Sequence, residues 1–282
     1  MKPRPFLKWA GGKTQLLPEL LKRIPSTWNP QTDLYVEPFV GAGALFWELQ
    51  PEHALLGDAL DILIVTWTAI KFCLPSVLAG LRALAESYKR EPKATYYEVR
   101  DEFNAQGLVC MPAAKLIFFN KTGFNGLYRT NSQGAFNVPW GKDPNAGIVD
   151  EGNLTACSDF LRRIDLNVVG GDFVEVINSC DTASLSGSLV YCDPPYIPVS
   201  KTSNFTSYTA DGFTYADQLR LIQYAVWLRD QGAHVILSHA ADEVLIENYR
   251  RCGFKCDLVS ARRAINSKGS KRGPVGEYII HG

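Results

Sequence analysis

The 282-residue sequence predicts an α/β protein with a mostly helical segment inserted into its core. Short apolar strands alternate with helical patterns up to about residue 58 and again after about residue 165, whereas the middle lacks that rhythm. Strand–helix alternation implies a parallel sheet covered by helices on both faces. We therefore expect one α/β core built from residues 1–58 and 146–282, and an inserted domain of residues 59–145.

The core strands are expected where short apolar runs lie between polar or glycine-containing turns. These runs are Leu34–Glu37, Ala54–Gly57, Leu166–Val169, Ser188–Cys192, His234–Ser238, Lys255–Ser260 and Glu277–Ile280. Helical patterns lie between most of them, for example at Tyr215–Arg229 and Asp242–Arg251. In the insertion, helices are expected at Asp61–Phe72, Ser76–Lys89, Tyr96–Asn104 and Ala113–Phe119. A loop rich in Gly, Asn and aromatic residues follows at 120–141.

The composition excludes several classes of protein. The apolar runs are far too short to span a bilayer, and the first residues do not resemble a secretion signal, so we expect a cytoplasmic protein without membrane contact. The seven cysteines show no disulfide framework and no zinc spacing, so they are expected to be reduced, and no metal site is predicted. The 29 basic and 29 acidic residues balance, yet a carboxylate-free basic run from Leu258 to Gly276 could contact phosphate or simply be solvated.

The segment Glu37-Pro-Phe-Val-Gly-Ala-Gly43 follows an expected strand and opens a helix at Ala44. Glycines let a backbone turn tightly beside a ligand, and the helix start offers free N–H groups. Asp58, at the end of the next strand, could accept hydrogen bonds from ribose hydroxyls. This pattern indicates a nucleoside site, although it also fits an ordinary strand–helix turn. The third glycine of a dinucleotide fingerprint is missing, which disfavours a cofactor with a pyrophosphate.

A second glycine-containing segment, Phe6-Leu-Lys-Trp-Ala-Gly-Gly-Lys13, precedes a helix expected from Thr14. It does not match a phosphate-binding loop, because Leu7 stands where that motif requires glycine. Lys13 could instead hold a carboxylate, such as that of a methionine moiety, and Trp9 could lie against an adenine ring.

The most specific signal is Asp193-Pro194-Pro195-Tyr196, which follows an apolar strand and therefore lies at the carboxyl end of the sheet. The exocyclic amine of adenine is a poor nucleophile, because its lone pair is delocalised into the ring. Asp193 and the carbonyl of Pro194 can each accept one N–H, which frees that lone pair to attack a sulfonium methyl group. Tyr196 can stack on the base and hold it close to the methyl donor. A tight turn without chemistry is the alternative reading.

The chain contains three characteristic segments in this order: Phe6–Lys13, Glu37–Gly43 and Asp193–Tyr196. In these segments and their order, the sequence resembles the Dam-like branch of the DNA N6-adenine methyltransferases, from about Phe6 to Tyr278. The resemblance implies a Rossmann-like S-adenosylmethionine-dependent methyltransferase core with a mostly helical inserted target-recognition domain. It also implies double-stranded DNA as the partner, with no obligate protein partner.

Site residues follow from the resemblance. Asp193, Pro194, Pro195 and Tyr196 are the expected catalytic element. The expected S-adenosylmethionine contacts are Trp9, Ala10, Gly11, Lys13, Glu37, Phe39, Gly41, Gly43, Asp58, Asp172, Phe173 and Asp193. Of these, Asp172 and Phe173 are expected to flank the adenine of the cofactor. A polar and aromatic segment, Ser200–Tyr208, resembles the loop that closes over the flipped base.

The loop Gly123–Arg129 resembles the segment of the family that enters DNA. Phe124 is an aromatic wedge beside a glycine, able to fill the stack when adenine is flipped out, and Asn125 could support the orphaned partner base. Arg129 has the fork geometry to read a guanine edge. The remaining expected DNA contacts are Leu127 and Pro139, which could sense a thymine methyl, and Lys8, which could touch a base. The implied target is GATC, although Phe124 stands where the family often has Tyr, and Thr122 and Thr130 occupy variable positions.

Three other functions remain open at this stage. A methyltransferase acting on RNA, on a protein amide nitrogen or on N4 of cytosine could use the same tetrapeptide, although the wedge loop favours DNA. A non-catalytic DNA-binding protein is disfavoured by the intact Asp193 and Tyr196. A nucleotide-dependent oxidoreductase is disfavoured by the missing third glycine.

Overall fold

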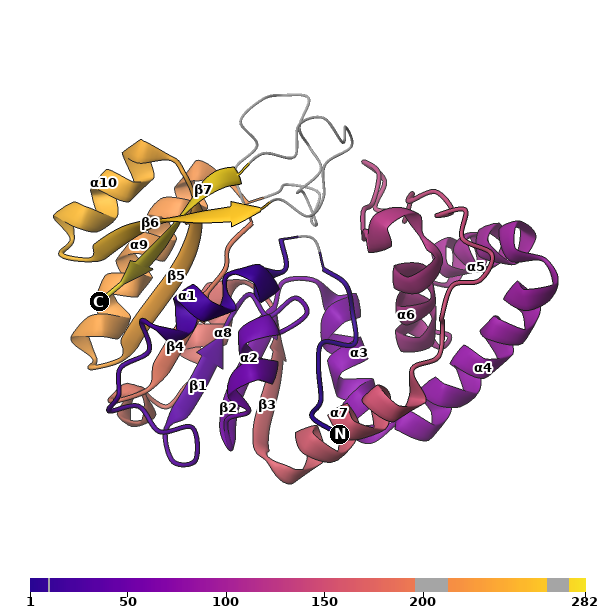
Figure 1. Ribbon diagram of the computed structural model, residues 1–282, viewed down its shortest axis with the longest axis horizontal. Helices are drawn as coiled ribbons and strands as arrows, with labels where there is room; N and C mark the ends of the chain where they lie inside the picture. Colours follow the sequence, from indigo (N-terminus) through magenta and orange to yellow (C-terminus); the bar gives the residue numbers. More distant parts are fainter. Residues whose placement is uncertain (10, 196–212, 263–273) are drawn as a thin grey trace.

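The computed structural model describes residues 1–9, 11–195, 213–262 and 274–282. Its centre is a seven-stranded sheet with the order β3-β2-β1-β4-β5-β7-β6 (Figure 1). The strands are β1 Leu34–Glu37, β2 His53–Asp58, β3 Asp165–Gly170, β4 Leu189–Cys192, β5 His234–Ala240, β6 Lys255–Arg262 and β7 Pro274–His281. Each expected strand overlaps an observed one, and the predicted α/β class is confirmed.

Strands β1 to β5 pair in parallel, as predicted. For the last strand the expectation of a parallel sheet is wrong, because β7 runs antiparallel between β5 and β6. The physical reason is the short connection: residues 263–273 are too few for the crossover that a parallel pair needs. Strand β7 thus lies inside the sheet, and β6 forms its edge.

Helices cover both faces of the sheet, as expected. One face carries α1 Leu17–Leu21, α2 Ala44–Leu49, α3 Asp61–Phe72 and α7 Glu151–Arg163, and the other carries α8 Phe173–Asn178, α9 Tyr215–Asp230 and α10 Glu243–Arg251 (Figure 1). Successive strand residues point to opposite faces, so Tyr35 belongs to the first of the two apolar cores and Val36 to the second. Short 3₁₀ turns, η1 Lys13–Gln15 and η3 Thr182–Leu185, complete this part of the chain.

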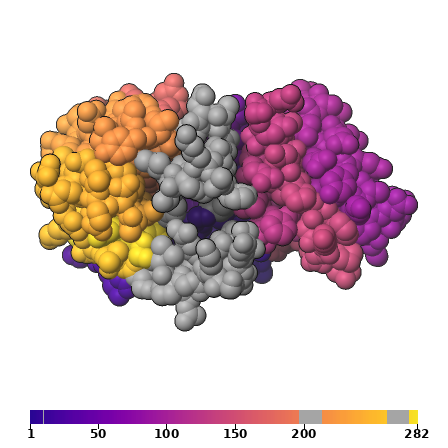
Figure 2. Space-filling view, turned by 90° about the horizontal axis from the view of Figure 1, so that it is seen from above, coloured from indigo at the N-terminus to yellow at the C-terminus, as the bar shows by residue number. Residues whose placement is uncertain are grey.

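A helical lobe extends from one end of the sheet. It contains α4 Leu74–Arg90, α5 Pro92–Gln106 and α6 Pro112–Thr122, which pack on one another, and α3 contacts both this lobe and strands β2 and β3. In Figure 2 the lobe and the strands β6 and β7 lie at opposite ends of an elongated molecule. After α6 the chain forms the 3₁₀ turn η2 Phe124–Gly126 and two isolated antiparallel bridges, Gly123 with Trp140 and Thr130 with Phe136.

In the described part of the chain, no single helix is long and apolar enough to cross a membrane. The pair α3 and α4 together reaches that length and composition, but the two helices meet at a bend of 112°.

Candidate active site

The site lies at the carboxyl ends of β1 and β4, where the strand order reverses. Glu37 is the last residue of β1 and Asp193 directly follows β4, and these two strands are paired neighbours. In open α/β sheets, ligands bind in the crevice at such a reversal. The topology thus brings the glycine-rich segment and the predicted catalytic segment, which are far apart in sequence, to one place.

Asp58 ties the glycine-rich loop to the end of β2. Its Oδ2 accepts a hydrogen bond from the backbone N–H of Gly41 (3.0 Å), and its Oδ1 accepts one from Leu60 (3.0 Å). Gly41 has a φ of +48°, and a Cβ at this position would lie 2.8 Å from Cδ1 of Trp9. Only glycine therefore allows Trp9 to pack this closely on the loop. Desolvation raises the pKa of Asp58 to about 6, against the opposing effect of the backbone N–H groups.

Glu37 is buried, with 2% of its surface exposed, and its Oε2 accepts a hydrogen bond from the hydroxyl of Tyr35 (2.8 Å). Burial raises the pKa of Glu37 well above its ordinary value, and the carboxylates of Asp193 and Asp58 add to the shift. Gly43, at the other end of the loop, also requires glycine, because a Cβ there would lie 2.9 Å from the ring of Trp67.

Aromatic rings gather beside this loop. Phe39 stacks on Phe173 with ring centroids 5.5 Å apart, and Phe213 meets Phe39 edge-on at 5.7 Å. Asp172 caps the start of α8, which fixes the position of Phe173. Arg220, which the sequence did not single out, binds Asp172 (Nη2 to Oδ1, 2.8 Å) and lies over the ring of Phe173. The structure thus brings Phe39, Phe173 and the ion pair of Asp172 with Arg220 together beside the glycine-rich loop.

Asp193 lies in a cluster of buried polar side chains. The ammonium of Lys13 is 2.9 Å from Oδ1 of Asp193 and 3.0 Å from Oε1 of Glu277, and it donates to the carbonyl of Gly11 (3.0 Å). The hydroxyl of Ser238 also donates to Oδ1 of Asp193 (2.8 Å). Burial raises the pKa of Asp193, Lys13 and Ser238 lower it, and Glu277 raises it. Glu277 and Ser238 were not predicted from the sequence.

Pro194 and Pro195 follow Asp193 at the end of β4, with Pro194 buried. Ala10, Tyr196, the segment Ser200–Tyr208 and most of the basic run, 263–273, lie outside the described residues.

The predicted recognition residues lie together on the segment after α6. Phe124 is 45% exposed, and its backbone N–H donates to the carbonyl of Pro139 (2.9 Å). Asn125, also exposed, has a positive φ of 56°. The guanidinium Nε of Arg129 donates to Oδ1 of Asn137 (2.7 Å). Leu127 is partly buried against the core. The loop is thus bonded internally at Phe124 and at Arg129.

The N-terminal segment joins this loop to the glycine-rich loop. Trp9, which packs on Gly41, also stacks on Tyr128 with centroids 6.2 Å apart. The side chain of Lys8 is exposed, and its backbone is bonded to the side chain of Asn120 on α6. Residues 8 and 9 therefore contact the glycine-rich loop, helix α6 and the loop that follows it.

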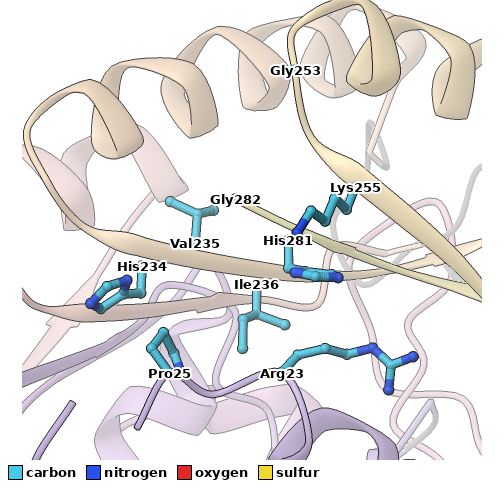
Figure 3. Close-up of a pocket in the computed structure, with 9 residues that line it drawn as sticks. All are labelled: Arg23, Pro25, His234, Val235, Ile236, Gly253, Lys255, His281 and Gly282. Atoms are coloured by element: carbon cyan, nitrogen blue, oxygen red, sulfur yellow. The ribbon is translucent and has the colours of Figure 1, made fainter. Parts of the chain in front are cut away.

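A cavity of about 230 Å³ lies elsewhere, at the opposite, amino-terminal edge of the parallel strands (Figure 3). Its lining residues include Arg23, His234, Lys255 and His281, and none of the predicted site residues. Two of these side chains are already paired, because Asp257 binds both Arg23 and His281. Within the described ranges, no group of three or more His, Cys, Asp or Glu residues is placed to hold a metal ion.

The chain is similar to known proteins along most of its length. The family described as D12 class N6 adenine-specific DNA methyltransferase matches residues 9–265. A type II methyltransferase of Methanocaldococcus jannaschii, M.MjaIII, is 38% identical, with 96% of each chain covered. M1.LlaDCHI, a type II methyltransferase of Lactococcus lactis, is 36% identical over 98% of this chain and 94% of its own. A DNA adenine methylase of Escherichia coli is 32% identical over 99% and 95%. The resemblance inferred from three short motifs is confirmed: the chain belongs to this family and is an adenine-specific DNA methyltransferase.

Proposed function

We propose that this enzyme transfers the methyl group of S-adenosylmethionine to N6 of an adenine in duplex DNA, within the sequence GATC, after the base has turned out of the helix. The observation that carries the proposal is the position of Asp193. It stands beside the buried end of β1 at the reversal of strand order, within a cluster that holds one of its oxygens.

The residues at the carboxyl edge fit the proposed cofactor. Asp58 would accept hydrogen bonds from ribose hydroxyls with the lone pairs that Gly41 and Leu60 leave open, since each carboxylate oxygen can accept more than one bond. The adenine ring would lie against the partly exposed Phe39, which Phe173 supports from behind, with Asp172 beside it. When bound, the cofactor supplies a methyl group on a positively charged sulfur.

The amine of the target adenine would be held by Asp193 and by the carbonyl of Pro194, each of which accepts one N–H. This pulls the nitrogen toward tetrahedral geometry and frees its lone pair. Transfer of the methyl group to that lone pair would release the sulfur as a neutral thioether, and the surplus proton of the amine would pass to Asp193 or to water. The prolines favour this arrangement, since neither has an N–H that would compete with the amine for an acceptor.

We further propose that residues 59–145 form the target-recognition domain and that residues 1–58 and 146–282 form the catalytic core. Helix α3 contacts strands β2 and β3 as well as α6, so it would join the two. Phe124, exposed beside Asn125, would enter the base stack, while Arg129 and Lys8 would reach base edges. Leu127 and Pro139 would contact apolar edges of the site.

The test is methyl transfer from labelled S-adenosylmethionine to duplexes that contain GATC or each single-base change of it, followed by digestion to nucleosides. Label on N6-methyladenine that is lost with every substitution is the expected result. Label on adenine without that dependence would refute GATC as the target, and label on cytosine would refute the proposed acceptor atom. Fluorescence of 2-aminopurine at the target position measures base turning: a rise on binding is expected, and an unchanged signal would refute it.

A further inference from the structure

The catalytic carboxylate has buried partners outside the tetrapeptide. We propose that Glu277 and Ser238 are positioning residues for Asp193, and that Glu277 shares the charge of Lys13 so that Asp193 keeps its own negative charge for the substrate amine. This inference rests on the proposed role of Asp193.

Lys13 stands between two carboxylates in a buried environment. The lysine is 5% exposed, and its ammonium has Asp193, Glu277 and the carbonyl of Gly11 within 3.0 Å. An ammonium has three N–H donors, so Lys13 can bond both carboxylates at once. The charges of these two carboxylates and this ammonium sum to one negative charge. A Lys13–Asp193 pair without Glu277 would be neutral, so Asp193 would attract the substrate amine less strongly.

Strand β7 places Glu277 beside β5. In the antiparallel register, Glu277 is paired with Ala240 and Ile279 is paired with Ser238, so Glu277 and Ser238 face the same side of the sheet. Both contact the Asp193–Lys13 pair on that side. The inserted antiparallel strand thus completes the cluster.

Ser238 fixes the orientation of Asp193. It is fully buried, and its hydroxyl donates its single proton to Oδ1 of Asp193, so the hydroxyl of Tyr191, 3.0 Å away, is the donor to Ser238. Lys13 contacts the same oxygen, Oδ1. Because Lys13 and Ser238 both hold Oδ1, Oδ2 is the oxygen that they leave for the amine.

The effect on Asp193 as a hydrogen-bond acceptor depends on which charged residue of the cluster is replaced. Without the charge of Glu277, Lys13 is neutralised by Asp193 alone, which weakens Asp193 as an acceptor. Without Lys13, Asp193 and Glu277, each about 3 Å from the same nitrogen, repel each other and share a proton. Removing both charges leaves Asp193 held by Ser238 and relieved of that repulsion.

The experiment compares Glu277→Gln, Glu277→Asp, Lys13→Met, the double variant Lys13→Met/Glu277→Gln, and Ser238→Ala. Glu247→Gln on the outer helix α10 and Ser188→Ala, which removes a buried hydroxyl bonded only to a backbone carbonyl, are the matched controls. For each variant, kcat and KM for duplex DNA, the Kd for S-adenosylhomocysteine and the Tm are measured.

For Glu277→Gln and for Ser238→Ala we expect kcat to fall about tenfold, less than on removal of the acceptor itself, with KM and Kd little changed. Glu277→Asp, which keeps the charge, should retain more of the wild-type kcat than Glu277→Gln. The double variant Lys13→Met/Glu277→Gln should have a higher kcat than Lys13→Met, because it lacks the repulsion between Asp193 and Glu277. A kcat of Glu277→Gln equal to that of Glu247→Gln overturns the proposal, and so does a double variant no faster than Lys13→Met.

If Glu277→Gln has a lower Tm than the wild type, its kcat can still be compared with that of Glu277→Asp. Equal kcat values in these two variants overturn the proposal. All variants are scored relative to the wild type on whichever base the wild type methylates. Absence of N6-methyladenine from the wild-type reaction would therefore count against the proposed function, whereas an active wild type with unaffected variants counts against this inference alone.

Discussion

The side-chain amide of Asn120 closes a pair of hydrogen bonds with the backbone of Lys8. Oδ1 of Asn120 accepts from the N–H of Lys8 (2.8 Å), and its Nδ2 donates to the carbonyl of Lys8 (2.6 Å). The same Nδ2 donates to the carbonyl of Gly126 in the loop after α6 (2.8 Å). One buried amide, 4% exposed, therefore joins the N-terminal segment to the proposed recognition loop.

Replacing Asn120 with Asp should disrupt this junction. The carboxylate keeps the shape of the amide but cannot donate, so it would face the carbonyls of Lys8 and Gly126 while buried. We expect a loss of about 2–4 kcal/mol in the free energy of unfolding, measured by denaturant titration, and weaker duplex binding. Asn145→Asp, at an exposed position, is the control. Equal stability of the two variants would contradict the role of Asn120.

Asp193→Ala should abolish turnover while the protein remains folded. Lys13 keeps Glu277 as a partner, so no buried charge is left unpaired, whereas the amine of adenine loses its charged acceptor. We expect kcat to fall by at least about a hundredfold, the usual effect of removing a group that stabilises the reacting atoms. Single-turnover methylation and DNA-binding assays on the same preparation separate the two effects. Turnover within a few-fold of wild type would exclude Asp193 as the acceptor.

Arg129→Ala should relax specificity at one base pair. Asn137 accepts a hydrogen bond from Nε of the guanidinium through its side chain (2.7 Å) and one from Nη2 through its backbone carbonyl (3.5 Å), which leaves Nη1 to read a base edge. The expected loss of discrimination is about 1–3 kcal/mol at that position, measured as the ratio of kcat/KM for GATC and single-base variants. Arg162→Ala, at an exposed arginine of α7 paired with Asp159, should leave the ratio unchanged. An unaltered base preference in Arg129→Ala would exclude direct readout by this side chain.

Gly41→Ala should weaken cofactor binding as well as lower the stability of the fold. The added Cβ would collide with the ring of Trp9, and the positive φ alone costs about 1–2 kcal/mol. Gly187→Ala is the matched control, because Gly187 has a φ of +76° with open space around the Cβ position. Gly41→Ala should lose more stability than Gly187→Ala because of the collision, and calorimetry on the folded variants should show at least about tenfold weaker cofactor binding only for Gly41→Ala. Equal affinities would place the cofactor away from this loop.

The pKa of Asp58, raised from 3.8 to about 6, predicts a pH dependence of cofactor affinity. The ionised form is the one that accepts hydrogen bonds from hydroxyl groups. Affinity should therefore be constant above about pH 6 and fall as pH drops below it, approaching tenfold per pH unit. The stability of the protein without cofactor depends on pH in the opposite direction. The contribution of protonated Asp58 to the free energy of unfolding is fully present below about pH 3.8 and is lost as pH rises through about 6.

Asp58→Asn is the comparison that isolates this carboxylate from the other titrating acids. The variant should bind the cofactor more weakly near pH 7.5, and the fall in affinity below pH 6 should be absent. A wild-type profile that is flat between pH 5 and 7, or a variant that keeps the wild-type profile, would exclude the proposed ribose contact.

Most of the fold was predictable because its strands and helices carry local patterns. Val190, Tyr191 and Cys192, for example, form an apolar run that can only be a buried strand or a short buried helix, and the turn residues after it favour the strand. The antiparallel entry of β7 was missed, although the lack of a helical pattern between β6 and β7 was visible. Pairing order depends on contacts between distant segments, which periodicity does not report.

The partners of Asp193 were missed for the same reason. Ser238 and Glu277 stand at ordinary positions in their strands, and only the pairing of β5 with β7 brings them to Lys13. One signal was available: Ser238 directly follows the apolar run Val235–Leu237, and Asn120 directly follows the apolar run Leu116–Phe119. A buried polar residue needs a partner, so both positions could have been identified as polar contacts without the partner being known.

The position of Glu277 on the last strand has a consequence for how the enzyme is made. Lys13 leaves the ribosome among the first residues and Glu277 among the later ones, after the recognition loop and Asp193 have already been synthesised. A nascent chain can therefore contain the whole helical lobe while Lys13 still lacks the carboxylate of Glu277. Methylation should begin only once β7 has emerged and slipped between β5 and β6, so that chains halted before this strand carry the recognition loop without an assembled catalytic cluster.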